Sequence, residues 1–159
     1  MNTILKLLEE NATLTHEQLA LMCNKETGDI KRMIEDYEQE GVILGYKTMI
    51  DWDKTDREYV SALIEVKITP QRDRGFDRVA EKIYKYPQVK SLYLMSGAYD
   101  LAVMIEGRTM KDVALFVAEK LAPMDNILST ATHFVLKKYK DDGLIFYDND
   151  EDTRQVITL

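Results

Sequence analysis

Three short helices are predicted by the spacing of apolar side chains in the first fifty residues. The first carries apolar residues at positions 4, 5, 7 and 8 and ends at Asn11. The second begins at Thr15, because Thr15 and Gln18 have the spacing of a capping box. The third has apolar residues at positions 30, 33, 34 and 37 and stops at Gly41. The run 42–50 then alternates as a small extended wing.

A polar stretch and a half-buried strand come next. Residues 51–58 have the composition of a linker. Residues 60–68 alternate between apolar and polar or mixed positions, which predicts a strand that ends at Pro70. Apolar positions 76, 79, 80 and 83 mark one face of a helix that stops before Pro87.

The remaining pattern completes a βαββαβ order. Two apolar strands, 89–96 and 100–106, are separated by a turn short enough for a hairpin. A second helix opens at Thr109, and residues 127–137 form the last strand. Strand, helix, strand, strand, helix, strand predicts a ferredoxin-like domain, in which two helices cover one face of a four-stranded antiparallel sheet.

The other face of this sheet has no predicted cover. The residues assigned to it are too apolar for solvent, so a second copy of the domain is expected to cover them; they are Tyr59, Leu63, Tyr93, Met95, Val103 and Val135. The whole chain is therefore an α+β protein with a winged helix-turn-helix and a βαββαβ domain. Its expected parts are the winged helix-turn-helix domain 1–50, the linker 51–58, the βαββαβ domain 59–140, whose uncovered face is expected to drive oligomerisation, and the acidic tail 141–159.

The composition indicates which class of protein and which cellular compartment to expect. The chain has 159 residues, 45% of them hydrophobic, which is ample for globular cores. Its single cysteine, Cys23, lies among apolar residues and forms no intrachain disulfide, which implies a reducing compartment. Residues 1–8 lack the features of a signal peptide, and no apolar run is long enough to span a bilayer. The expected location is the cytoplasm.

Net charge argues against DNA binding by bulk electrostatics. The chain carries −7, with −4 in residues 1–50, +1 in residues 51–138 and −4 in residues 139–159. The helix-turn-helix part is itself acidic, so any DNA-binding surface must be a local basic spot.

Two groups of residues carry a resemblance to a known family. The first is Ile34, Glu38, Gly41, Val42 and Ile43, and the second is Gly97-Ala98-Tyr99-Asp100-Leu101, with Thr130-Ala131-Thr132 in the final strand. The first group resembles the helix-three ending, and the second the G-x-Y-D hairpin, of the leucine-responsive regulatory protein/AsnC (feast/famine) family of regulators. The resemblance spans about residues 3–140 and implies a RAM-type C-terminal domain that dimerises through its sheets, often closes into octamers, and binds an amino acid or similar effector.

The resemblance places the effector near the hairpin. The site residues it implies are Gly97, Tyr99 and Asp100, with Thr130 or Thr132 lining the cleft. A glycine lets a ligand approach the backbone, and a carboxylate pairs with an α-ammonium group. From the residues alone, a simple turn at Gly97 capped by Asp100 is the competing interpretation.

The DNA-binding residues implied by the same resemblance lie in and around the third helix. They are Lys25, Thr27, Gly28, Lys31 and Arg32, with Lys47 in the wing for backbone contact. The chain has Glu26 where the family usually has a serine cap, and the exposed face also carries Asp29, Glu35 and Asp36. Carboxylates near phosphates are repulsive, so the affinity for DNA is expected to be modest or to rest on oligomer avidity.

Two other functions compete with a DNA-binding regulator. An enzyme is disfavoured, because His16 and His133 have no nucleophile or carboxylate motif around them, and no zinc, dinucleotide or P-loop spacing is present. No cofactor or metal is therefore expected. The acidic third helix favours the second alternative, an effector-binding or partner-modulating oligomer of the same fold with little DNA binding of its own.

Overall fold

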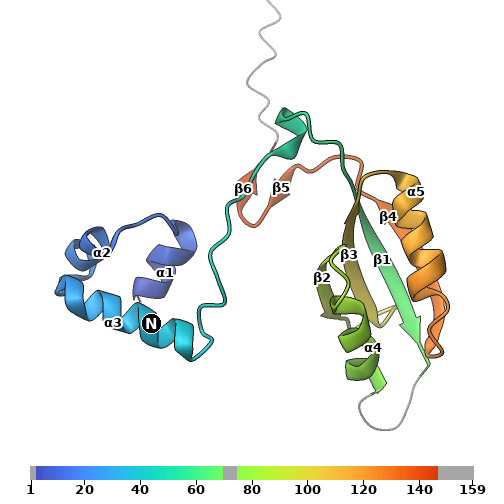
Figure 1. The fold of residues 1–159 in the computed structure, drawn as a ribbon, viewed down its shortest axis with the longest axis horizontal. Helices are drawn as coiled ribbons and strands as arrows, with labels where there is room; N and C mark the ends of the chain where they lie inside the picture. Colours follow the sequence, from blue (N-terminus) through green and yellow to red (C-terminus); the bar gives the residue numbers. More distant parts are fainter. Residues whose placement is uncertain (1–2, 70–74, 147–159) are drawn as a thin grey trace, which may run out of the picture. The chain divides into compact units, whose positions relative to one another are not determined.

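The computed structural model describes residues 3–69 and 75–146. The chain divides into two units, Met1–Ile50 and Asp51–Leu159, which we call unit 1 and unit 2 (Figure 1). In the described part of the chain, no helix is both long enough and apolar enough to cross a membrane.

Unit 1 is built from three helices, α1 (Thr3–Glu10), α2 (His16–Cys23) and α3 (Thr27–Gln39). The predicted capping box of α2 is confirmed: the Gln18 amide donates to the Thr15 hydroxyl, and the Thr15 amide donates to the Gln18 side chain at 2.8 Å. Asn24 takes the left-handed conformation, with φ of 50°, and ends α2. The tight α2–α3 connection follows from this turn.

One small apolar cluster holds the three helices together. Its buried members are Ile4, Leu8, Leu19, Ala20, Ile30 and Ile34. Residues 42–50 belong to no helix or strand, so the expected wing has no β-ladder within the described residues. Gly41, with φ of +71°, turns the chain out of α3, in agreement with its predicted role as a stop.

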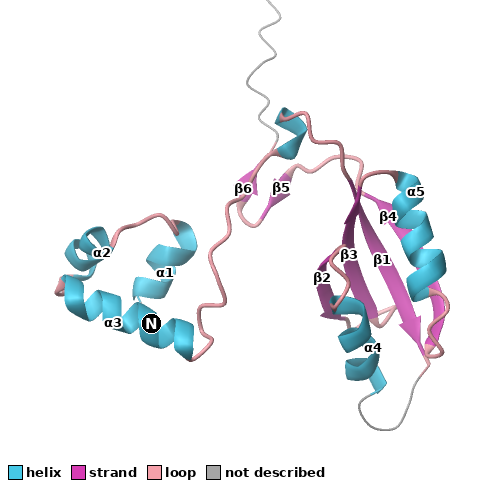
Figure 2. Cartoon of the chain, in the orientation of Figure 1, coloured by secondary structure: helices cyan, strands magenta, loops and turns pink. Residues whose placement is uncertain are grey.

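Unit 2 contains the predicted βαββαβ order, and all of its sheet pairings are antiparallel (Figure 2). The strand order is β2-β3-β1-β4. The elements are η1 (Trp52–Lys54), β1 (Val60–Ile68), α4 (Gly75–Tyr84), β2 (Val89–Leu94), β3 (Leu101–Gly107), α5 (Met110–Phe116), η2 (Val117–Leu121) and β4 (Ile127–Phe134). A small hairpin of β5 (Lys140–Asp141) and β6 (Leu144–Ile145) occupies the start of the expected acidic tail, and residues 147–159 lie outside the described ones.

The helix-covered face of the sheet is set by alternate residues of β1. Ile64 and Val66 are completely buried and pair with Val103 and Leu101 of β3. Val103 therefore lies in the core, and its assignment to the uncovered face was wrong. The other face, which we call the open face, carries Leu63 and Tyr93 as predicted, since Leu63 pairs with Met104 and Tyr93 with Ala102.

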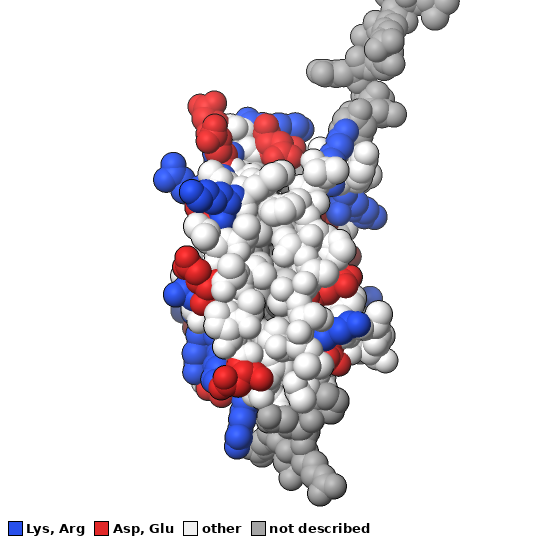
Figure 3. Space-filling model, turned by 90° about the vertical axis from the view of Figure 1, so that its right-hand side faces the viewer, with Lys and Arg blue, Asp and Glu red and all other residues white. Residues whose placement is uncertain are grey.

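The edge strand β4 is notably free of formal charge. Its sequence, from Ile127 to Phe134, contains no Asp, Glu, Lys or Arg. Figure 3 shows the side of unit 2 that carries β4 and α5, where uncharged atoms form a band along the molecule with charged side chains at its margins. Natural edge strands commonly carry charges that discourage pairing with other chains, so this side of the sheet is unusually open to association.

Candidate functional site

The two cations of α3 that are predicted to contact DNA, Lys31 and Arg32, are solvent-exposed, and each already forms an ion pair with a carboxylate of the same helix. The Arg32 guanidinium donates to the Asp29 carboxylate at 2.8 Å, and the Lys31 ammonium lies 3.9 Å from the Glu35 carboxylate. Both pairs run along the outer surface of the same helix. A phosphate that engages either cation must therefore compete with a neighbouring carboxylate.

The start of α3 has no side-chain cap. Thr27 and Gly28 are its first two residues, and Glu26 at the N-cap makes no capping hydrogen bond. The Lys25 amide donates to the Ala20 carbonyl at 3.0 Å, which closes the α2–α3 turn. The predicted residues Lys25, Thr27, Gly28, Lys31 and Arg32 thus share one turn and the first turns of one exposed helix.

Tyr46 anchors the extended segment that carries Lys47, and sequence analysis did not find it. The Tyr46 hydroxyl donates to the Glu38 carboxylate of α3 at 2.9 Å. Burial, followed by this hydrogen bond, raises the pKa of Tyr46 above its ordinary value, so the hydroxyl is protonated near neutral pH. The eight-residue separation of the two side chains is no recognisable motif, which is why only the structure reveals the contact.

Asp100 ties the hairpin to the central strand. Its carboxylate accepts from the Ile68 amide at 2.7 Å, while its own amide donates to the Val66 carbonyl at 3.0 Å. The Met95 amide closes the turn by donating to the Asp100 carbonyl at 2.8 Å. Asp100 therefore has a structural role at the end of β1, whatever else it binds.

Gly97 and Tyr99 lie in the same turn. Gly97 is exposed, and a Cβ added there would meet no atom within 4 Å. Tyr99 is half-buried. The backbone at Gly97 is thus accessible to a ligand from the solvent side.

The two threonines of β4 do not lie beside the hairpin within one protomer. Thr130 pairs with Val66 and Thr132 with Ile64, so both follow the helix-covered face of the sheet. Strand β1 separates β4 from β3, which puts about 10 Å between the backbones of Thr130 and Leu101. Within one protomer, Thr130 and Thr132 are therefore not adjacent to the hairpin 97–100.

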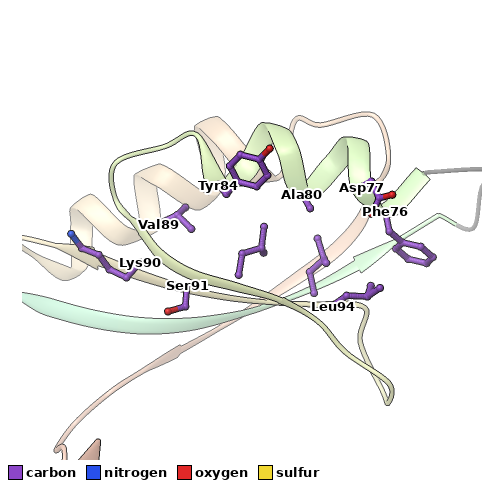
Figure 4. Close-up of a pocket in the computed structure, with 10 residues that line it drawn as sticks. Phe76, Asp77, Ala80, Tyr84, Val89, Lys90, Ser91 and Leu94 are labelled. Atoms are coloured by element: carbon purple, nitrogen blue, oxygen red, sulfur yellow. The ribbon is translucent and has the colours of Figure 1, made fainter. Parts of the chain in front are cut away.

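A hollow of about 330 Å³ opens next to the hairpin, between α4 and the edge strand β2 (Figure 4). Leu94 and Leu101, which flank the hairpin on either side, belong to its lining. Most of the other contacts are apolar, with Asp77 and Lys90 as the charged members; the remaining lining residues are Phe76, Ala80, Tyr84, Val89, Ser91 and Leu92. The hollow is large enough for a small apolar side chain.

No metal centre is apparent in residues 3–69 and 75–146, where no three His, Cys, Asp or Glu side chains are grouped to hold an ion.

Comparison with known proteins identifies both units. A family model described as the Lrp/AsnC ligand binding domain matches residues 61–145. The chain is 49% identical over 156 residues to YugG of Bacillus subtilis, an uncharacterised HTH-type transcriptional regulator, and the match covers 98% of this chain and 94% of YugG.

Two solved structures share the fold. E. coli AsnC superposes with a TM-score of 0.65 at 21% identity, over 85% of this chain and 89% of AsnC. The regulator NMB0573 of Neisseria meningitidis, crystallised as an L-Met complex, superposes with a TM-score of 0.71 at 23% identity, over 89% of this chain and 93% of that one. Both likenesses support the α+β architecture.

The hairpin geometry predicts that Asp100→Ala destabilises unit 2 by about 1.5–3 kcal/mol, because the Ile68 amide loses a charged acceptor. Asp100→Asn retains an oxygen for that amide and should lose less. Urea unfolding of the two variants and the wild type measures the difference. Equal stability of Asp100→Ala and the wild type would show that the carboxylate is not a structural anchor.

Proposed function

The chain belongs to the Lrp/AsnC family of transcriptional regulators, and from this premise we propose that it binds operator DNA through α3 under the control of an amino acid bound at the hairpin 97–100. It is a regulator with a ligand-binding domain, and not an enzyme.

The observation that supports DNA binding most directly is the outward position of Lys31 and Arg32 on α3, beyond the tight α2–α3 turn. Ile30 and Ile34 hold the opposite side of α3 in the core, which leaves Lys31 and Arg32 facing outward. In a helix-turn-helix, the helix that follows the short turn and presents such residues is the one that reads the DNA, and here that helix is α3. Its carboxylate neighbours reduce non-specific attraction to phosphates, so binding depends on a matching operator.

The effector proposal rests on the accessible backbone at Gly97 and the apolar hollow beside it. NMB0573, which has the same fold, was crystallised with L-Met. An α-amino acid offers charged groups for the hairpin and a side chain for the hollow between α4 and β2. Gly97, Tyr99 and Asp100 are the hairpin residues proposed to meet it, with Thr130 or Thr132 supplied across a protomer interface.

Assembly completes the proposal. The open face exposes Tyr93 and half-exposes Leu63 and Met104, while two helices cover the opposite face. Apolar side chains on one face of a sheet are stabilised by a second layer, and a second copy supplies one with two-fold symmetry. We propose a homodimer through this face, which closes into a larger assembly such as an octamer.

Lys31→Ala and Arg32→Ala should each weaken operator binding, and the slope of log K against log salt should fall by about one unit for each lost phosphate contact. Glu35→Gln should tighten binding, because it frees Lys31 and removes a negative charge near the phosphates. Fluorescence anisotropy with the labelled operator measures all three.

Lys85→Ala is the matched control for Lys31→Ala. Lys85 is equally exposed and is also paired with a carboxylate four residues away, but it directly follows α4 in unit 2. If Lys31→Ala and Arg32→Ala bind the operator as Lys85→Ala does, α3 is not the reading helix.

Gly97→Ala should weaken binding of L-methionine by about tenfold or more without changing stability. The added Cβ has open space in the free protein, so a loss of affinity reports a ligand held against that backbone. Calorimetry gives the affinity, and thermal unfolding confirms the fold. Unchanged L-methionine binding would place the effector elsewhere.

Tyr93→Lys should shift the protein towards monomers, because it puts a charge in the proposed sheet-to-sheet interface. Tyr84→Lys is the control, since both tyrosines are 57% exposed but Tyr84 lies on α4. Sedimentation velocity at micromolar concentration distinguishes them. A Tyr93→Lys protein that keeps the wild-type mass would exclude this face as the dimer interface.

A further inference from the structure

A second hollow lies at the end of the sheet opposite to the hairpin 97–100. Its volume is about 620 Å³, within the range of small-molecule sites. The start of β2, the end of β3 and one side of α5 form its walls, together with residues 57–59, which lead into β1. Strand β3 runs for about 20 Å between the two ends, so this cleft, which we call the distal cleft, is separate from the hairpin site.

Charges of both signs line the distal cleft in equal number. The four cations are Arg57, Lys90, Arg108 and Lys120, and the four carboxylates are Glu58, Glu106, Asp112 and Glu119. A cleft with no excess of either sign fits a zwitterion better than a simple anion or cation.

Only some of these groups are engaged inside the protein. Glu106 lies 3.5 Å from Arg57 and 3.7 Å from Lys90, and Asp112 accepts from the Thr109 amide at 2.9 Å. Within the described residues, no ion pair is formed by Arg108 or Glu119. Lys120 and Glu58 form none in the described part of the chain either, so two cations and two carboxylates are available to a ligand.

An apolar surface lies between the available charges. Asp112, Leu115, Phe116 and Glu119 line the cleft at helical spacing along α5 and η2, so their side chains share one face. Leu115 is 42% exposed although it is aliphatic. A ligand that covers it gains the burial of apolar surface.

We propose that the distal cleft binds an L-α-amino acid with an apolar side chain. Arg108 pairs with the α-carboxylate, Glu119 with the α-ammonium group, and Leu115 and Phe116 contact the side chain. The site is additional to the hairpin effector site and requires neither DNA binding nor occupancy of the hairpin.

The same cleft touches the segment that joins the two units. The Arg57 guanidinium stacks 4.3 Å from the ring centre of Trp52 and 5.6 Å from that of Tyr59. Figure 1 shows this segment entering β1 at the end of unit 2 where α5 begins. A ligand bound in the cleft lies next to Arg57, which also lines it, and so changes the surroundings of Trp52, the only tryptophan in the chain.

The test follows Trp52 fluorescence while the full-length protein is titrated with L-leucine, L-methionine and L-phenylalanine. We expect a saturable change with at least one of them. For that amino acid, Arg108→Ala and Glu119→Gln should each weaken binding by about ten- to a hundredfold, the effect of losing one charge-assisted contact. Lys111→Ala is the control, because Lys111 is an exposed cation at the start of α5 outside the cleft.

Ligand analogues test directly whether binding needs both charged groups of the amino acid. L-leucinamide lacks the carboxylate and 4-methyl-2-oxopentanoate lacks the ammonium group, and both should bind at least tenfold more weakly than L-leucine if L-leucine is bound. Gly97→Ala should keep the fluorescence response, since the hairpin lies at the other end of β3.

Three results would overturn the proposal: no saturable response to any of the three amino acids, equal responses of Arg108→Ala and Lys111→Ala, or a response abolished by Gly97→Ala but not by Arg108→Ala. The last result would leave the hairpin effector site intact and remove only the distal one. Operator binding without amino acids, measured in parallel on Arg108→Ala, tests the DNA-binding function independently.

Discussion

The antiparallel pairing of β1 with both of its neighbours is the constraint on which unit 2 depends. Alternate residues of this strand, including Ile64 and Val66, are completely buried beneath the helices. A slip of one residue would turn them onto the open face and bring Glu65 into the core. The register therefore fixes which face the helices cover, which face is left open, and where each end of β3 lies. Asp100 reinforces it by holding the Ile68 amide at the point where β1 ends.

The parts of the fold with strong local signals were predictable from the sequence. The capping boxes at Thr15 and Thr109 each satisfy two backbone amides, and the structure contains both. Strand β1 alternates cleanly, so its two faces were assigned correctly. Strand β3 is apolar at nearly every position, and with no alternation to follow, Val103 was placed on the wrong face.

The candidate sites were less accessible to sequence analysis, because they depend on contacts between distant residues. The Tyr46–Glu38 hydrogen bond and the Asp100–Ile68 anchor join side chains or backbone groups that no motif connects. The distal cleft assembles residues from four separate segments, and Arg108, one of its available cations, looks in the sequence like an ordinary surface residue. The carboxylate neighbours of Lys31 and Arg32 were visible in the sequence, but their pairing along α3 was established only by distances.

Because unit 1 is acidic, the central question for this regulator is whether it distinguishes its operator from unrelated DNA. Because α3 carries internally paired charges, the proposed binding of operator DNA through this helix requires base contacts and several copies acting together more than phosphate attraction. The most direct measurement compares the affinity of the full-length protein for the region upstream of its own gene with that for an unrelated duplex, at rising salt concentration. The account predicts that the preference for the upstream region persists as salt rises. Affinities for the two duplexes that are equal and fall together would contradict it and identify an effector-binding oligomer with little DNA recognition of its own.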